Sequence, residues 1–162
     1  MNVDAFWSPG LDLCWDLTKG LPLADGSMKG IYTEHMLEHI PFDQVLPLLS
    51  ELKRILRKDG TIRIVVPDAE LYLDLYQSAK RGMRQPFPYE TARTDTPIMH
   101  VNRIFRAEGH EYAYDHETLS ALLGKAGFKN ITKESFDRGR DPNLLIDSEH
   151  RKVESLYVEA SS

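Results

Sequence analysis

The chain has 162 residues, a formal net charge of −5, and a composition that is 41% hydrophobic and 28% charged, as in one soluble globular domain. The acidic balance and the lack of a long basic run argue against nucleic acid as a partner. No membrane span or signal-peptide pattern is visible, so we expect a cytoplasmic protein that needs no membrane. The single cysteine, Cys14, fits a reducing compartment, and its apolar surroundings predict a buried, inert thiol.

The first third of the chain predicts three short strands followed by a helix. The strands are expected at residues 2–6, 11–17 and 29–33. Apolar residues at helical spacing then predict a helix over residues 42–57, with a short first turn and its main part from about Pro47. Asp59 and Gly60 are expected to end that helix.

The middle of the chain opens with its clearest strand pattern, TIRIVV at residues 61–66. Asp68 is the expected N-cap of a helix that runs through Ala79. Residues 81–113 are irregular and hold few periodic apolar positions, except for a helix expected near residues 97–106.

The last third predicts one helix and two strands. Asp115 is the expected N-cap of a helix that ends at Gly127. Residues 131–136 and 155–160 have strand patterns, and residues 137–150 between them form a polar loop that is a candidate mobile segment. The alternation of apolar runs and helices predicts one α/β domain over residues 1–162, with a mainly parallel sheet.

The stretch TEHMLEHI contains His35-x-x-Glu38-His39, the H-x-x-E-H signature of a zinc peptidase class. Such a site needs both histidines on one face of a stable helix. A strand pattern precedes this motif and Pro41 follows it closely, which favours a loop or a single turn. A third ligand cannot be identified, although His100 and His110 can be proposed. We therefore expect no metal site and keep a zinc hydrolase as a remote alternative.

Several segments, taken in order, resemble the class I, Rossmann-like S-adenosylmethionine-dependent methyltransferases, and the small bacterial "predicted methyltransferase" group most of all. The segments are WDLTKGLPLADGSMKGIYTEHMLEHI, LPLLSELKRILRKDGTIRIVVPD, GHEYAYDHETLSALLGKAGFKNI and ESLYVEA. The resemblance implies a mostly parallel α/β sheet with an antiparallel last strand. It also implies S-adenosylmethionine as cofactor and S-adenosylhomocysteine as product.

The resemblance implies that three residues near the N-terminus bind the cofactor. Asp4 corresponds to the acidic residue that accepts hydrogen bonds from the ribose hydroxyls, as in other dinucleotide folds. Asp16 and Leu17 correspond to the pair beside the adenine. A different interpretation stays open for both carboxylates, because Asp4 can be a turn residue and Asp16 a helix cap.

The same resemblance places Thr33, Glu34 and His35 in the loop that faces the methionine end of the cofactor and the methyl acceptor. Thr33 and Glu34 are then cofactor-binding residues, and His35 is the candidate general base. Glu38 and His39 would orient that loop.

Residues 81–113 correspond to the variable segment on the substrate side. Four of its side chains are candidate contacts for the methyl acceptor: Arg103, Arg106, His110 and Tyr112. A solvated helix face explains the two arginines equally well, and the acceptor itself cannot be read from the sequence.

One family element has no counterpart in the chain. The family begins with a central strand and a glycine-rich turn that wraps the methionine part of the cofactor. Here the residues after Met1 correspond to the second family strand, so the sheet is expected to be truncated at its N-terminus. A start further upstream, a homodimer partner that supplies the strand, or a closed-up sheet would each account for this gap.

The sequence therefore predicts a methyltransferase acting on an unidentified acceptor, with activity impaired if the glycine-rich loop is lacking. The main alternative is a methyltransferase-like domain without cofactor, kept for partner binding or as a relic.

Overall fold

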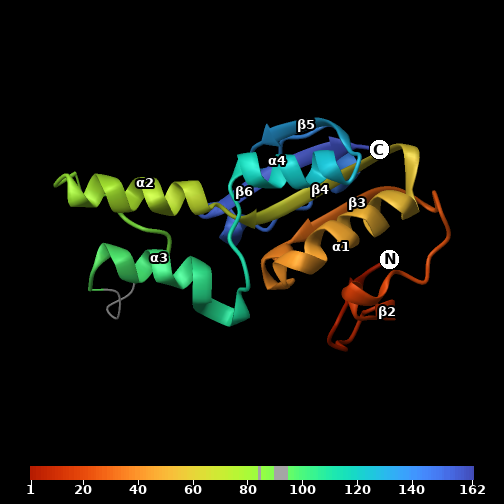
Figure 1. The fold of residues 1–162 in the computed structure, drawn as a ribbon, viewed down its shortest axis with the longest axis horizontal. Coiled ribbons are helices and arrows are strands. Elements are labelled where there is room, and N and C mark those ends of the chain that lie inside the picture. The colour runs from red at the N-terminus through yellow and green to blue at the C-terminus, as the bar shows by residue number, and fades with distance from the viewer. Residues whose placement is uncertain (84, 90–94) are drawn as a thin grey trace.

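The structure is a computed structural model that describes residues 1–83, 85–89 and 95–162. Its six strands are β1 (Val3–Asp4), β2 (Leu13–Cys14), β3 (Met28–Glu34), β4 (Leu56–Pro67), β5 (Lys129–Glu134) and β6 (Ser155–Ser161). Its four α-helices are α1 (Phe42–Ile55), α2 (Ala69–Lys80), α3 (Pro97–Arg106) and α4 (His116–Lys125) (Figure 1). Five single turns of 3-10 helix connect them: η1 (Leu17–Lys19), η2 (Leu37–His39), η3 (Ala107–Gly109), η4 (Pro142–Leu144) and η5 (Glu149–Arg151).

The main sheet has the strand order β3-β4-β6-β5. Strands β3 and β4 are parallel, whereas β6 is antiparallel to both of its neighbours. This arrangement confirms the expected α/β sheet in which only the last strand reverses direction. Among the described residues, β1 and β2 form a separate parallel pair that is not joined to the main sheet.

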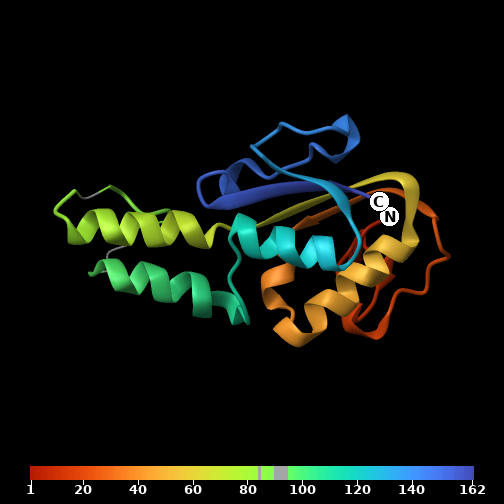
Figure 2. The same ribbon diagram turned by 45° about the horizontal axis from the view of Figure 1, so that its top comes forward.

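The main hydrophobic core lies between the sheet and one helical layer. Helices α1 and α4 cover one face of the sheet, and the segment between β5 and β6 covers the other (Figure 2). In the second half of β4, Ile62, Ile64 and Val66 belong to this core and alternate with residues of the opposite face. None of the helices in the described part of the chain is long and apolar enough to cross a membrane.

Helix α1 runs through Pro47 without a break, so the expected start near this residue is wrong. A proline inside a helix costs about 3 kcal/mol. The buried apolar stripe of α1 offsets this cost, since it packs Val45, Leu48, Leu49, Leu52 and Ile55 into the core. The helix ends at Ile55, and β4 begins at once with Leu56 instead of at residue 61.

Helices α2 and α3 lie side by side and extend beyond the end of the sheet (Figure 1). They share a second small core made of Ala69, Tyr72, Leu75, Phe87 and Ile104. The predicted N-cap Asp68 is confirmed, because its side chain accepts hydrogen bonds from the backbone N–H groups of Glu70 and Leu71.

The β1–β2 pair is much shorter than the sequence predicted, with two residues in each strand. Cys14 is exposed there, which contradicts the expected buried thiol. The reason is that a lone pair of strands buries little surface. Its Sγ lies 3.5 Å from the carbonyl oxygen of Ala5.

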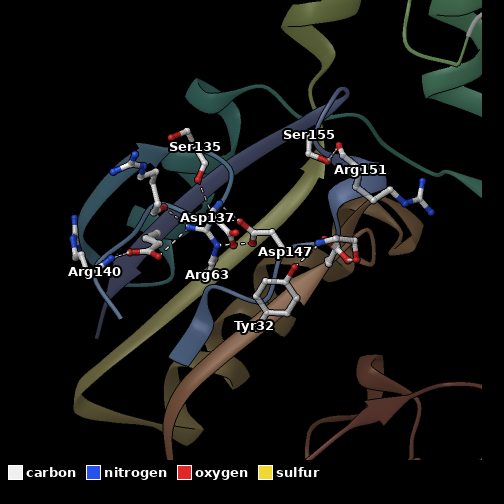
Figure 3. A network of polar contacts seen from close by, with 12 residues as sticks. Tyr32, Arg63, Ser135, Asp137, Arg140, Asp147, Arg151 and Ser155 are labelled. Carbon is white, nitrogen blue, oxygen red and sulfur yellow. Dashed lines mark hydrogen bonds and ion pairs between the residues drawn. The ribbon is translucent and has the colours of Figure 1, made fainter. Parts of the chain in front are cut away.

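A buried ion network occupies the sheet face opposite the helices (Figure 3). The Arg63 and Asp147 side chains are both fully buried and form a bidentate pair, with Arg63 Nε 2.8 Å from Asp147 Oδ1. Arg63 also donates to Glu159 Oε1 at 3.0 Å and to the carbonyls of Arg138 and Ser135. Burial alone would lower the pKa of Arg63, but its bonds to the two carboxylates raise it above the ordinary value.

This network holds residues 135–147 against the sheet, contrary to the expectation of a mobile loop. The close approach of this segment to the sheet requires glycine at position 139, because a Cβ atom there would lie 1.9 Å from Glu159 Oε1. The segment needs no regular structure of its own, since buried charges on the sheet bind its backbone.

A second ion pair fastens the N-terminal region to α1. Arg54 binds both carboxylate oxygens of Glu51, and it also donates to the carbonyls of Leu21 and Leu23 and to Asp25. Glu51 in turn accepts a hydrogen bond from the Leu21 N–H at 3.1 Å. Hydrogen bonds from Arg54 and then Leu21 lower the pKa of Glu51 to about 2.

We expect Asp147→Asn to lower the free energy of unfolding by about 3 kcal/mol, because it breaks a buried ion pair and leaves Arg63 without its bidentate partner. Urea unfolding at pH 7 measures this change. Asp137→Asn in the same segment is the matched control, because only its backbone N–H joins the network. Equal stability of the two variants would contradict the role given to Asp147.

We expect Glu51→Gln to destabilise the protein at pH 7 by about 1 kcal/mol, as is usual for a partly exposed pair. The folded-state pKa lies below the ordinary 4.5, so this contribution is present above pH 4.5 and is lost as the pH falls toward 2. Urea unfolding between pH 2 and 7 should show the difference from wild type shrinking in that window. Asp43→Asn, an exposed carboxylate of the same helix, is the control, and a pH-independent difference for Glu51→Gln would refute the assignment.

Candidate functional site

A cavity of about 730 Å³ lies between the β1–η1 region and the β3–η2 region. Pockets for small ligands typically measure roughly 300–1,000 Å³. The lining includes every residue that the sequence marked as cofactor-binding or catalytic: Asp4, Asp16, Leu17, Thr33, Glu34 and His35. The structure thus brings these six residues together around one space, with apolar side chains of the same two regions between them.

The first wall of this cavity carries two carboxylates. Asp4 Oδ1 accepts a hydrogen bond from the Phe6 N–H at 2.9 Å, and no other partner is found for it in the described chain. Asp16 caps η1, accepting from Thr18 N at 3.0 Å and Thr18 Oγ1 at 2.6 Å, while Lys19 Nζ lies 3.3 Å from Oδ2. These bonds, led by that of the Thr18 hydroxyl, lower the pKa of Asp16. Asp4 is thus a turn residue and Asp16 a helix cap, the alternatives that the sequence left open. Both residues also line the cavity.

The opposite wall is formed by β3, which lies at the edge of the main sheet. Its Thr33 Oγ1 is buried without a hydrogen-bond partner among the described residues. Backbone groups on the outer edge of β3 likewise lack a neighbouring strand within the described part of the chain. A buried hydroxyl without a partner is costly, so a ligand that bonds to it would relieve that cost.

The Glu34 side chain binds another segment of the protein itself, at Ser148. Its carboxylate accepts hydrogen bonds from the Ser148 N–H at 2.9 Å, from the Ser148 hydroxyl and from the Tyr32 hydroxyl at 2.9 Å. Burial would raise the pKa of Glu34, but these bonds outweigh it and lower the pKa. Its side chain therefore fixes the segment after η4 against β3.

His35 follows β3 in a left-handed backbone conformation with φ 48°, which is uncommon outside glycine. Its N–H donates to the Val65 carbonyl at 2.9 Å, and its Nε2 lies 2.8 Å from Ser155 Oγ. Burial, and then the nearby positive charge of Arg151, lower the pKa of His35 to about 4. The imidazole is therefore neutral at physiological pH and has a fixed orientation.

The four substrate-side candidates are not brought together. Arg103 and His110 line a small cavity of about 20 Å³ with His35, which has room for roughly one water molecule. Arg106 is exposed and lies outside both cavities, and Tyr112 stacks on Phe42 with ring centroids 4.2 Å apart. Only Arg103 and His110 are therefore placed beside a candidate site residue.

Glu38, His39 and His110 form a group whose potential metal-ligand atoms all lie within 4.8 Å of one another. Residues 35–39 are not an α-helix, because η2 is a single turn that begins after His35, as predicted. The helical geometry of an H-x-x-E-H peptidase is therefore absent. Glu38 is 1% exposed, and its burial raises its pKa to about 7.

Several functional neighbours were missed by the sequence analysis. Ser148, Arg151 and Ser155 surround Glu34 and His35 although they are more than 110 positions away in the chain. Glu108 lines both cavities together with His35. No local pattern marks these residues, because their placement depends on how β6 and its preceding segment pack on the sheet.

Residues 5–133 match the model of a family described as a methyltransferase domain. Among curated proteins, no sequence matches the chain.

Solved structures of similar fold include SAM-dependent methyltransferases from two organisms. A SAM-dependent methyltransferase from Archaeoglobus fulgidus matches with a TM-score of 0.57 and 16% identity, over 94% of this chain and 68% of the other. A SAM-dependent methyltransferase and possible histamine N-methyltransferase from Thermotoga maritima matches with a TM-score of 0.56 and 17% identity, over 94% and 64%. PigF with SAH matches with a TM-score of 0.54 and 13% identity, over 94% and 36%. This chain thus spans about two thirds or less of the length of these proteins.

We expect Glu34→Ala to lower the free energy of unfolding by about 2 kcal/mol in the absence of any ligand, since it removes hydrogen bonds to a charged acceptor. Amide hydrogen exchange should also rise around residue 148. Glu149→Ala is the matched control, because that carboxylate is exposed and pairs only with Lys152 among the described residues. A Glu34→Ala variant as stable as this control would show that Glu34 does not hold the segment.

Proposed function

This chain belongs to the methyltransferase domain family, and on that premise we propose that it binds S-adenosylmethionine in the 730 Å³ cavity and directs methyl transfer to a nucleophilic acceptor. One observation carries the assignment. Two carboxylates on one wall, those of Asp4 and Asp16, lie across a space of ligand size from the edge strand β3 and its residues Thr33 and Glu34.

The residues present fit most parts of that cofactor. Asp4, whose Oδ2 has no hydrogen-bond partner among the described residues, would accept hydrogen bonds from the two ribose hydroxyls. Asp16, kept ionised by Thr18, would accept from the adenine amino group, and Leu17 would contact the ring. When bound, the cofactor supplies an electrophilic methyl group on a sulfonium, so the protein's main task is to position the two reactants.

The β3 end of the cavity would receive the methionine part and the acceptor. Thr33 lines this end of the cavity, and the Glu34 side chain supports the region through Ser148. His35 stays a proposed catalytic residue, and its low pKa makes it a weak base at pH 7. A role in orienting the acceptor through its fixed ring fits this environment better.

The segment 81–113 is proposed as the substrate side of a single domain. Arg103 and His110 line the small cavity beside His35, and they are the residues proposed to contact the methyl acceptor. Arg106 and Tyr112 would reach an acceptor only if it extended beyond that cavity.

A binding domain without cofactor is the second candidate. The observation that favours it is the gap between the β1–β2 pair and the free edge of β3. A strand from a second copy of the chain would pair with both edges, so a homodimer is the assembly we propose to complete the sheet. The single cysteine and the net charge of −5 support a cytoplasmic location without nucleic-acid or membrane partners.

We expect S-adenosylmethionine to bind the wild-type protein in isothermal titration calorimetry, and Asp4→Asn to weaken binding roughly 10- to 100-fold, the range for a lost hydrogen bond to a charged group. Asparagine can still accept the Phe6 N–H bond, so the local turn is retained. Asp43→Asn, an exposed residue on α1 outside the cavity, is the control and should bind like wild type. Lack of binding at millimolar cofactor would favour the cofactor-free binding domain.

A further inference from the structure

We propose that Glu38, His39 and His110 form a binding site for a divalent transition-metal cation such as Zn²⁺. The site lies between η2 and the segment that follows α3, and the proposed methyl transfer does not require it. Two imidazoles and a carboxylate are a common donor set for zinc. The expectation of no metal site rested on the non-helical context of the motif and on an unidentified third ligand. In the structure His110, one of the candidates named from the sequence, lies beside Glu38 and His39.

The three side chains converge from two segments that are fixed to each other. Their potential ligand atoms lie within 4.8 Å, and the His39 and His110 rings meet edge to face with centroids 4.9 Å apart. The backbone N–H groups of Glu111 and Tyr112 both donate to the Glu38 carbonyl, at 2.8 and 3.2 Å. Ligand atoms around a tetrahedral zinc ion are about 3.3 Å apart, so small rotations of the rings would complete the site.

His110 already has the orientation of a metal ligand. Its Nδ1 lies 2.8 Å from the Ile104 carbonyl oxygen, which can only accept a hydrogen bond. The proton of the neutral ring is therefore on Nδ1, and the Nε2 lone pair is free. A histidine that ligates a metal through one nitrogen while donating from the other to a carbonyl is the usual arrangement.

The environment of the Glu38 carboxylate points most directly to a bound cation. Its side chain is 1% exposed, and neither carboxylate oxygen has a hydrogen-bond partner among the described residues. A buried, unpaired carboxylate is strongly unfavourable. A positive ion bound to it would provide the missing compensation.

The His35 ring, which lies beside Glu38, gives a second reason to expect a cation near the Glu38 carboxylate. The Ser155 hydroxyl donates to the Arg151 carbonyl, so it accepts from His35 Nε2, which then carries the proton of the neutral ring. The lone pair of His35 Nδ1 consequently faces Glu38 Oε1 at 3.4 Å. Two acceptors face each other there, and either a proton on Glu38 or a cation close by must separate them.

A protonated Glu38 without metal is the competing explanation, and the raised pKa of Glu38 is compatible with it. The two explanations differ in what a metal does. A merely protonated carboxyl group would give no stoichiometric binding and no dependence on His110.

The test uses the full chain, freed of metal with a chelator and titrated with Zn²⁺ in calorimetry without S-adenosylmethionine. Co²⁺ then reports the coordination by its visible absorption. We expect one ion per chain, and a loss of affinity of about 100-fold or more for His39→Ala and His110→Ala, since even the removal of an outer-shell partner costs roughly 10- to 100-fold. His116→Ala, which removes a histidine on α4 outside the group, should bind like wild type.

Glu38→Gln keeps the test decisive if an alanine variant fails to fold. The amide removes the buried charge, so this variant should melt at a higher temperature than metal-free wild type, yet Zn²⁺ should no longer raise its melting temperature. Absence of stoichiometric binding to wild type would overturn the proposal, as would binding that survives in both His110→Ala and Glu38→Gln. The result is independent of cofactor binding, so either proposal can fail while the other stands.

Discussion

The bidentate pair between Arg63 and Asp147 determines the geometry of the site although it takes no part in it. A guanidinium buried on a sheet needs acceptors for all of its N–H groups. Two carboxylates and two backbone carbonyls supply them, and most of these come from residues 135–147. Residues beyond Asp147 are thereby placed on β3, where Ser148 meets Glu34.

The Arg63–Asp147 pair also determines the surroundings of His35, through residues that follow Asp147 in the chain. Arg151 and Ser155 follow further along the chain. Ser155, whose hydroxyl donates to the Arg151 carbonyl, fixes the tautomer of the His35 ring. Burial, and then the charge of Arg151, lower the pKa of His35. The end of β3 is thus enclosed by groups whose positions depend on a charge pair elsewhere on the sheet face. Such long-range dependence explains why a substitution far from the cavity can change its chemistry.

Much of the fold was predictable because its signals are local. The caps at Asp68 and Asp115 predicted the starts of α2 and α4, and the helix expected near residues 97–106 is α3. The six residues that the resemblance assigned to the cofactor and the reaction line one cavity, and their roles stay predictions. The buried role of Arg63 had no local signal, since its alternating strand position normally faces water. The meeting of Glu38 with His110 was equally hidden, because it depends on a contact between distant segments.

The two walls of the cavity differ in stability, because the β1–β2 pair is so small. One wall belongs to a four-stranded sheet with a packed core, while the other includes two strands of two residues each. Arg54 and Glu51 of α1 bind the chain only further along, at residues 21, 23 and 25. Regions with few backbone bonds open by themselves at low free energy. A molecule that bridges both walls would therefore order the weaker one as it binds. Part of its binding energy would be used for this local folding, so occupancy and rigidity of the N-terminal region would rise together.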